Sequence, residues 1–145
     1  MTVKQYLGQI QRLDMMINHR IEQAEDLRRK AFALRSPELK SDKVLTSPAG
    51  DQLADAIAKY VDKQRQIDAM IDHYTDLKNE IIGQIDALED KRYVRILHMK
   101  YVQYMSLSEI AEAIPYEYYY ACRLHGRALR ALERQVKDIV SIKSR

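Results

Sequence analysis

Turn-forming residues and cysteine are scarce in this chain. Its 145 residues include only four glycines and three prolines, and because β-rich folds need many such residues in their turns, the scarcity favours long helices. The single cysteine, Cys122, excludes an internal disulfide framework and is typical of proteins from reducing compartments. No apolar run reaches membrane-spanning length, and the N-terminus lacks the apolar core of a secretory signal. We therefore expect a cytoplasmic protein with no membrane partner.

Charge is divided unevenly along the chain, although the net charge is only +3. Residues 1–90 hold 13 Lys or Arg against 16 Asp or Glu, whereas residues 91–145 hold 11 against 5. A mildly acidic body followed by a basic C-terminal third indicates that this third contacts a polyanion.

The N-terminal part of the chain predicts two long helices. From Val3 to Leu34, apolar residues recur at alternating spacings of three and four, and only Arg20 interrupts this seam. A second seam runs from about Pro48 to Glu89 and is interrupted by Gln64 and Lys78. Spacing of this kind, sustained over several heptads, is typical of helices that pack along their whole length against another helix.

The connection between these helices, about residues 35–50, is rich in serine and proline and predicts a surface loop. The two helices would then fold back on each other as a hairpin spanning residues 1–89. Further apolar residues flank both seams, where a two-stranded coiled coil would carry charges, so three or four helices are needed to bury them. We expect a homodimer whose N-terminal helices form a four-helix bundle. The alternative is a hairpin that lies against its own C-terminal domain.

Residues 90–145 are expected to form a separate domain, and they begin with another predicted helix. Asp90 is placed to cap a helix that covers Lys91 to about Val102, in which apolar residues again recur at spacings of three and four. The residues Gln103–Met105 then predict a turn.

Two more helices follow that turn. Ser106 and Glu109 match a capping box, which opens a short helix over Leu107–Ile114, and Pro115 ends it. The last helix begins near Tyr118 and runs to about Ile139. A short helix, a brief break and a longer helix are the arrangement of a helix-turn-helix.

The last predicted helix carries five basic residues at alternating spacings of four and three, on the side opposite its apolar face. They are Arg123, Arg127, Arg130, Arg134 and Lys137. Only Glu133 and Asp138 lie among them, so few of these charges can be neutralised within the helix. A cationic row beside a helix-turn-helix indicates binding to a phosphate backbone. The alternative is an ordinary solvated amphipathic helix.

Two segments of this region resemble region 4 of bacterial sigma-70-type factors. Ser108–Ile114 matches the first helix of that motif and Arg127–Leu132 matches the later part of its recognition helix, within a likeness that covers about residues 88–136. The whole chain also resembles small phage and prophage proteins related to the RinA/ArpU-type late-gene regulators, and the segments Tyr6–Asp14 and Arg123–Leu129 carry this wider match. The resemblance implies an all-α protein of the bacterial host cytoplasm that binds specific double-stranded DNA sequences and regulates transcription.

The resemblance also implies which side chains meet DNA. The base-facing positions of the recognition helix would be Tyr118, Tyr119, Cys122 and Arg123. Phosphates would be held by Arg127 and Arg130, and the basic row adds Arg134 and Lys137 to that set. Sigma factors carry Arg and Glu where Tyr118 and Tyr119 stand, so their promoter specificity does not transfer. They usually carry glycine where Pro115 stands, and because proline forbids positive φ, the turn must take another path.

Two other functions share these features. A DNA-packaging component similar to a terminase small subunit also joins a helix-turn-helix to an oligomerising helical segment, and a sigma-like module would act by binding RNA polymerase. An enzyme is not indicated, because the four histidines show neither an i, i+4 pair nor cysteine partners and the chain has no glycine-rich phosphate loop. We therefore expect no catalytic residues, no metal site and no cofactor.

Overall fold

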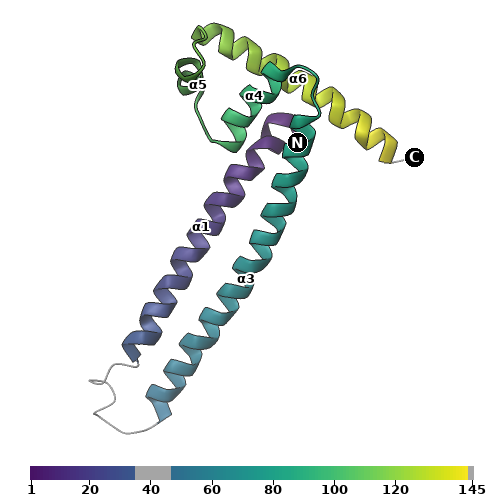
Figure 1. Cartoon of the computed structure of the whole chain (residues 1–145). Coiled ribbons are helices and arrows are strands. Elements are labelled where there is room, and N and C mark those ends of the chain that lie inside the picture. The colour runs from purple at the N-terminus through teal and green to yellow at the C-terminus, as the bar shows by residue number, and fades with distance from the viewer. Residues whose placement is uncertain (35–46, 144–145) are drawn as a thin grey trace. The chain divides into compact units, whose positions relative to one another are not determined.

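The computed structural model describes residues 1–34 and 47–143, and every regular element within these ranges is helical. In chain order the elements in Figure 1 are α1 (Val3–Leu34), α3 (Ser47–Asp86), α4 (Lys91–Leu97), the π-helix η1 (His98–Val102), α5 (Leu107–Ala113) and α6 (Tyr118–Lys143). In these described ranges, no helix combines the length and the apolar character needed to cross a bilayer. The all-α prediction is confirmed.

The boundaries of the long helices match the prediction closely. Helix α1 covers Val3–Leu34, as expected. Helix α3 begins at Ser47 and ends at Asp86, three residues before the expected Glu89. The loop expected at about residues 35–50 lies mostly outside the described residues, and its last four residues belong to α3.

Tertiary contacts divide the chain into two compact units. One unit, called the terminal unit below, joins residues 1–13 to residues 74–145, and the other, the middle unit, comprises residues 14–73. A domain boundary after residue 89 stays a prediction, but the start of α1 and the end of α3 group with the C-terminal helices.

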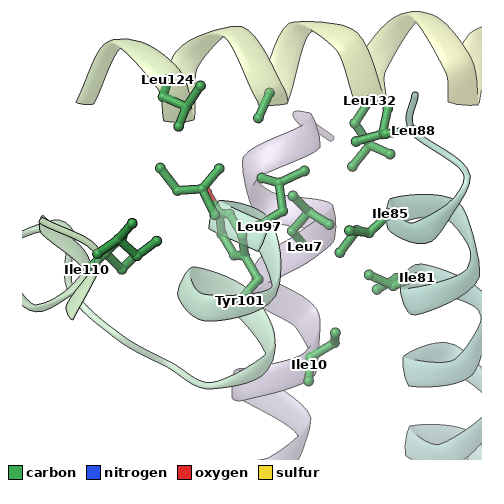
Figure 2. Close-up of a cluster of buried hydrophobic side chains, with 13 residues drawn as sticks. Leu7, Ile10, Ile81, Ile85, Leu88, Leu97, Tyr101, Ile110, Leu124 and Leu132 are labelled. Atoms are coloured by element: carbon green, nitrogen blue, oxygen red, sulfur yellow. The ribbon is translucent and has the colours of Figure 1, made fainter. Parts of the chain in front are cut away.

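A single apolar core explains this grouping in the terminal unit. Leu7 and Ile10 of α1 and Ile81 and Ile85 of α3 are completely buried. They pack with Leu88, Ile96, Leu97, Tyr101, Ile110, Ile114, Leu124, Ala128 and Leu132 (Figure 2). Complete burial of one Leu or Ile side chain contributes about 1.5–3 kcal/mol. The folded terminal unit therefore depends on residues from both ends of the chain.

Both helix caps predicted from the sequence are present. The Asp90 carboxylate accepts a hydrogen bond from the backbone N–H of Arg92 at 3.0 Å. The Ser106 hydroxyl accepts from the backbone N–H of Glu109 at 3.1 Å, and the Glu109 carboxylate accepts from the backbone N–H of Ser106 at 3.2 Å. Helices α4 and α5 therefore begin where these side chains satisfy their free N–H groups.

The helix expected over Lys91–Val102 changes type before it ends, so that prediction is wrong in its last turn. Residues His98–Val102 form the π-helix η1, in which the backbone N–H of Gln103 donates to the C=O of His98 at 2.9 Å. A π-helical turn holds one extra residue and therefore rotates the side chains that follow it. Tyr104 then turns the chain toward α5 with a φ of 60°.

The link between α5 and α6 works without glycine. Helix α5 ends at Ala113, and Ile114 is already extended, with φ −111° and ψ 107°. Among the described residues, the only non-glycine residue with a positive φ is Tyr104, on the other side of α5. The link around Pro115 therefore contains no residue with a positive φ, which agrees with the restriction that proline imposes.

In the middle unit, α1 and α3 lie side by side in opposite directions (Figure 1). Their seam buries Ile17 and Ala24 of α1 together with Ala56 and Ile67 of α3. The apolar seams found in the sequence therefore face each other, as the hairpin prediction requires.

Candidate nucleic-acid interface

One face of helix α6 is fixed in the core of the terminal unit. Ala121, Leu124, Ala128 and Leu132 are at most 1% exposed. Residues spaced by three and four share one side of a helix, so these side chains form a continuous buried stripe. Through this stripe α6 packs against α4 and α5, and its opposite side faces outward.

That outward side is lined by exposed arginines. They are Arg123, Arg127, Arg130 and Arg134. Within the part of the chain that the structure describes, none of these four guanidinium groups forms a hydrogen bond or an ion pair with the protein. Lys137 continues the row and pairs with Glu133 at 3.2 Å. The four arginines are therefore available to an external anion.

The first turn of α6 contributes aromatic side chains to this region. Tyr119 is 67% exposed and stands four residues before Arg123, so the two share the outward face. Tyr118 and Cys122 occupy a neighbouring strip, where the hydrogen bond between their side chains raises the pKa of Tyr118. Of the residues expected to face bases, Tyr119 and Arg123 thus lie together, with Tyr118 and Cys122 beside them.

Two polar contacts hold α6 to the neighbouring elements. The Arg92 guanidinium donates to the Tyr120 hydroxyl at 3.0 Å and pairs with Asp90 at 2.8 Å. The hydrogen bond from Arg92 lowers the pKa of Asp90, and the bond to Asp90 raises the pKa of Arg92. Further along α6, the Gln135 side chain donates to the backbone C=O of Gln84 at 2.6 Å. These contacts connect α6 to the start of α4 and the end of α3.

A groove of about 660 Å³ runs beside the arginine row. One wall belongs to α6 and contains Arg127, Arg130 and Arg134. The other wall is the segment between α3 and α4, with Glu89 and Asp90. The groove therefore carries positive charge on one side and negative charge on the other, and Glu89 would repel an approaching phosphate.

The buried face of α6 also holds a histidine that was not among the predicted site residues. His125 is 7% exposed, and its Nε2 lies 2.8 Å from the hydroxyl of Tyr101 on η1. Burial lowers the pKa of His125 to about 4 and raises the pKa of Tyr101 to about 12, so both side chains are uncharged at neutral pH. The sequence held a signal for this position, because His125 stands four residues after Ala121 and three before Ala128 on the apolar stripe.

The candidate interface therefore combines cationic and aromatic side chains on one face of a helix whose other face is fixed in the core. Among the residues described, no group of three or more His, Cys, Asp or Glu side chains is arranged to hold a metal ion.

Comparison of the chain with protein-family models, with curated proteins and with solved structures finds no match.

Proposed function

We propose that this protein binds specific double-stranded DNA sequences and serves as a phage or prophage transcriptional regulator. In this proposal α5 and α6 form a sigma-4-like helix-turn-helix, and α6 is the recognition helix. One observation carries the proposal: four exposed arginines line the face of α6 opposite the core, with no protein partner among the described residues. A row of basic residues whose charges are not neutralised within the protein is suited to binding a phosphate backbone.

The length of the row supports a duplex as the partner. At a rise of about 1.5 Å per residue, Arg123 and Arg134 lie about 16 Å apart along α6. The major groove is about 12 Å wide, so a helix lying in it with this face inward would bring Arg123 to the base edges and the far end of the row to the phosphates at the edge of the groove. Helix α5 would then cross the backbone, as the first helix of such a motif does.

Position along α6 separates two roles. The N-terminal part of a recognition helix contacts base edges, which assigns base reading to Arg123 and Tyr119, with Tyr118 and Cys122 at the flank of the same site. Arginine forms a bidentate contact with guanine, and tyrosine offers one hydrogen bond or an apolar contact with a thymine methyl group. The residues assigned to phosphates are Arg127, Arg130, Arg134 and Lys137.

The test uses the full-length protein and duplexes that it selects from a random pool, with affinity measured by fluorescence anisotropy at several salt concentrations. If four or five side chains reach phosphates, log K falls with log salt at a slope of about −4. Arg130→Ala should weaken binding to selected and random duplexes alike and make the slope shallower by about one. Arg123→Ala should weaken binding to the selected duplex by roughly tenfold to a hundredfold and change random binding much less.

Arg65→Ala is the matched control, because it removes the same charge from an exposed position in the middle unit. We expect it to leave both affinities unchanged. The proposal is refuted if the protein does not bind DNA at low salt. It is also refuted if Arg65→Ala, Arg123→Ala and Arg130→Ala lose the same affinity on both kinds of duplex.

A further inference from the structure

The middle unit has a second apolar surface beside its buried seam. Phe32 is 62% exposed and Ile57 is 39% exposed, and with Arg28 they line a shallow pocket of about 180 Å³ that α1 and α3 form together. Ile21 and Ile71 are 42% and 40% exposed. Ile21 precedes Phe32 by eleven residues and Ile71 follows Ile57 by fourteen, which are close to three and four whole helical turns. These side chains therefore lie on the same side of the two helices.

Polar residues occupy the middle of this surface. Glu25 and Arg28 are exposed on α1 and pair with each other at 3.3 Å. Gln64 on α3 stands seven residues from Ile57 and seven from Ile71, so it shares their face. We define the lateral face as Ile21, Glu25, Arg28 and Phe32 of α1 with Ile57, Val61, Gln64, Asp68 and Ile71 of α3.

The lateral face has a two-fold symmetric pattern. On α1 the order is apolar, acidic, basic, apolar at spacings of four, three and four, with its midpoint between residues 26 and 27. On α3 the two isoleucines lie seven residues on either side of Gln64, which is their midpoint, while Val61 and Asp68 occupy the positions between them on the same face. Phe32 and Ile57 line the same pocket, and moving from that pocket to the two midpoints takes five to six residues on α1 and seven on α3. The midpoints therefore lie at a similar height along the two helices, to within about one helical turn.

We infer that the lateral face binds a second copy of this chain in antiparallel orientation, about a two-fold axis that passes through these midpoints. Ile21 then packs on Phe32 of the second copy, and Ile57 packs on Ile71 of the second copy. Glu25 meets Arg28 of the second copy. Because a two-fold axis repeats every contact, each pairing occurs twice and Gln64 meets its own counterpart on the axis.

Charge selects this orientation over the parallel one. A two-fold axis along the helices would also join apolar ends, but it would place α1 over α3 of the second copy. At the register set by the pocket that Phe32 and Ile57 share, Glu25 would then face the neutral Gln64 and Arg28 would face Val61. The antiparallel arrangement instead forms two opposite-charge pairs.

The inference gives a face and an orientation to the homodimer that the sequence predicts. It does not depend on DNA binding, because all of its residues lie in the middle unit. Loss of dimerisation and loss of DNA binding are separate measurements, so either proposal can fail while the other stands.

The first test measures the dimer dissociation constant of the full-length protein by sedimentation velocity. Glu25→Arg should weaken dimerisation roughly tenfold, because it creates two like-charge pairs across the axis. Arg28→Glu should do the same. The double variant E25R/R28E should recover self-association but form mixed dimers with the wild-type chain roughly tenfold more weakly than pure ones, as read by native mass spectrometry of a mixture. The pairing within α1 is equally possible in the double variant, so only contact between two copies explains this preference.

The second test locates the axis by cross-linking with a short bifunctional maleimide in a Cys122→Ala background. Gln64→Cys should cross-link efficiently to its own counterpart. The matched control is Asp62→Cys, which is also exposed but lies about 160° away around α3, and it should not cross-link. Far-UV circular dichroism checks that each variant is folded.

Four results would overturn the inference. They are a monomer at tens of micromolar protein, an assembly larger than a dimer, mixed dimers that form as readily as pure ones, and equal cross-linking of the two cysteine variants. A monomer that still binds DNA would leave the proposed function in place, whereas an antiparallel dimer with no affinity for DNA would leave only this inference.

Discussion

Acidification should destabilise the protein through His125. The pKa of this histidine is about 4 in the folded protein against an ordinary value of 6.5. The unfolded chain therefore takes up a proton near pH 6.5, whereas the folded chain stays neutral until about pH 4. Because the unfolded state binds more protons in this window, stability is full above pH 6.5 and falls as the pH falls toward 4.

The magnitude follows from the same pKa difference. One pKa unit corresponds to about 1.4 kcal/mol, so the complete loss is roughly 3 kcal/mol, and about 2.5 kcal/mol of it is reached at pH 4.5. Burial is the main cause, and the positive charges of Lys100 and Lys4 add to it. The pKa of Tyr101 is about 12, so its hydroxyl stays protonated and offers no compensating negative charge.

The assay is urea denaturation followed by far-UV circular dichroism at pH 7 and pH 4.5. Carboxylates also titrate over this range, so the comparison protein is the double variant Tyr101→Phe/His125→Phe. It removes both polar groups together and leaves neither without a partner. The wild-type protein should lose about 2–3 kcal/mol more than this variant between the two pH values. If the two proteins lose stability equally, His125 is not buried as a neutral side chain and the reasoning fails.

Three further predictions follow from the terminal unit. Ser106→Ala removes the hydroxyl that accepts from the backbone N–H of Glu109 in the capping box at the start of α5 and should cost about 1 kcal/mol in thermal denaturation, whereas an unchanged melting temperature would show that the cap contributes nothing. Leu132→Ala leaves a cavity at a completely buried position of α6 and should cost about 2–5 kcal/mol in urea denaturation, so a loss under 1 kcal/mol would contradict the packing. Glu89→Gln removes a negative charge from the wall facing the arginine row and should strengthen DNA binding by a few-fold at low salt in the anisotropy assay. The gain should shrink at high salt, and a weaker binding constant would place Glu89 away from the phosphates.

The sequence predicted well those features that depend on residues near each other along the chain. The seam from Val3 to Leu34, the cap at Asp90 and the capping box at Ser106 each rest on side chains within one or two turns of the group that they satisfy. Spacing along α6 likewise predicted the separation of the arginine row from the buried stripe. Interactions of this kind can be predicted because the residues that form them are close in the sequence and remain close in the folded protein.

Features that depend on distant contacts were not visible. The seam predicts that Ile10 and Ile81 are buried, but it leaves open whether a second copy of the chain or the C-terminal helices bury them. No residue type in His98–Val102 marks a π-helical turn, because it arises where packing requires an extra residue. One such requirement is visible here, since the turn holds Tyr101 within hydrogen-bonding distance of His125.

The candidate interface was predicted in part for the same reason. Helical spacing places Arg127 and Arg130 on the outward face, but only coordinates distinguish side chains with a partner from those without one. In the described part of the chain Lys137 has a carboxylate partner in Glu133, whereas the arginines of the row have none. The expected phosphate contacts therefore differ in how much competition they meet from the protein itself.

This difference provides a way to distinguish DNA from an acidic protein surface, such as a face of RNA polymerase, as the partner of the row. A duplex presents phosphates at regular intervals, and each arginine that reaches one releases a counterion. Alanine substitutions along Arg127, Arg130 and Arg134 should then weaken binding by similar factors, each with a similar reduction in salt dependence. Lys137→Ala should cost less, because Glu133 competes for that ammonium group. A folded protein partner concentrates affinity in one or two residues at the centre of its interface, so a single dominant arginine with a weak salt dependence would argue against DNA.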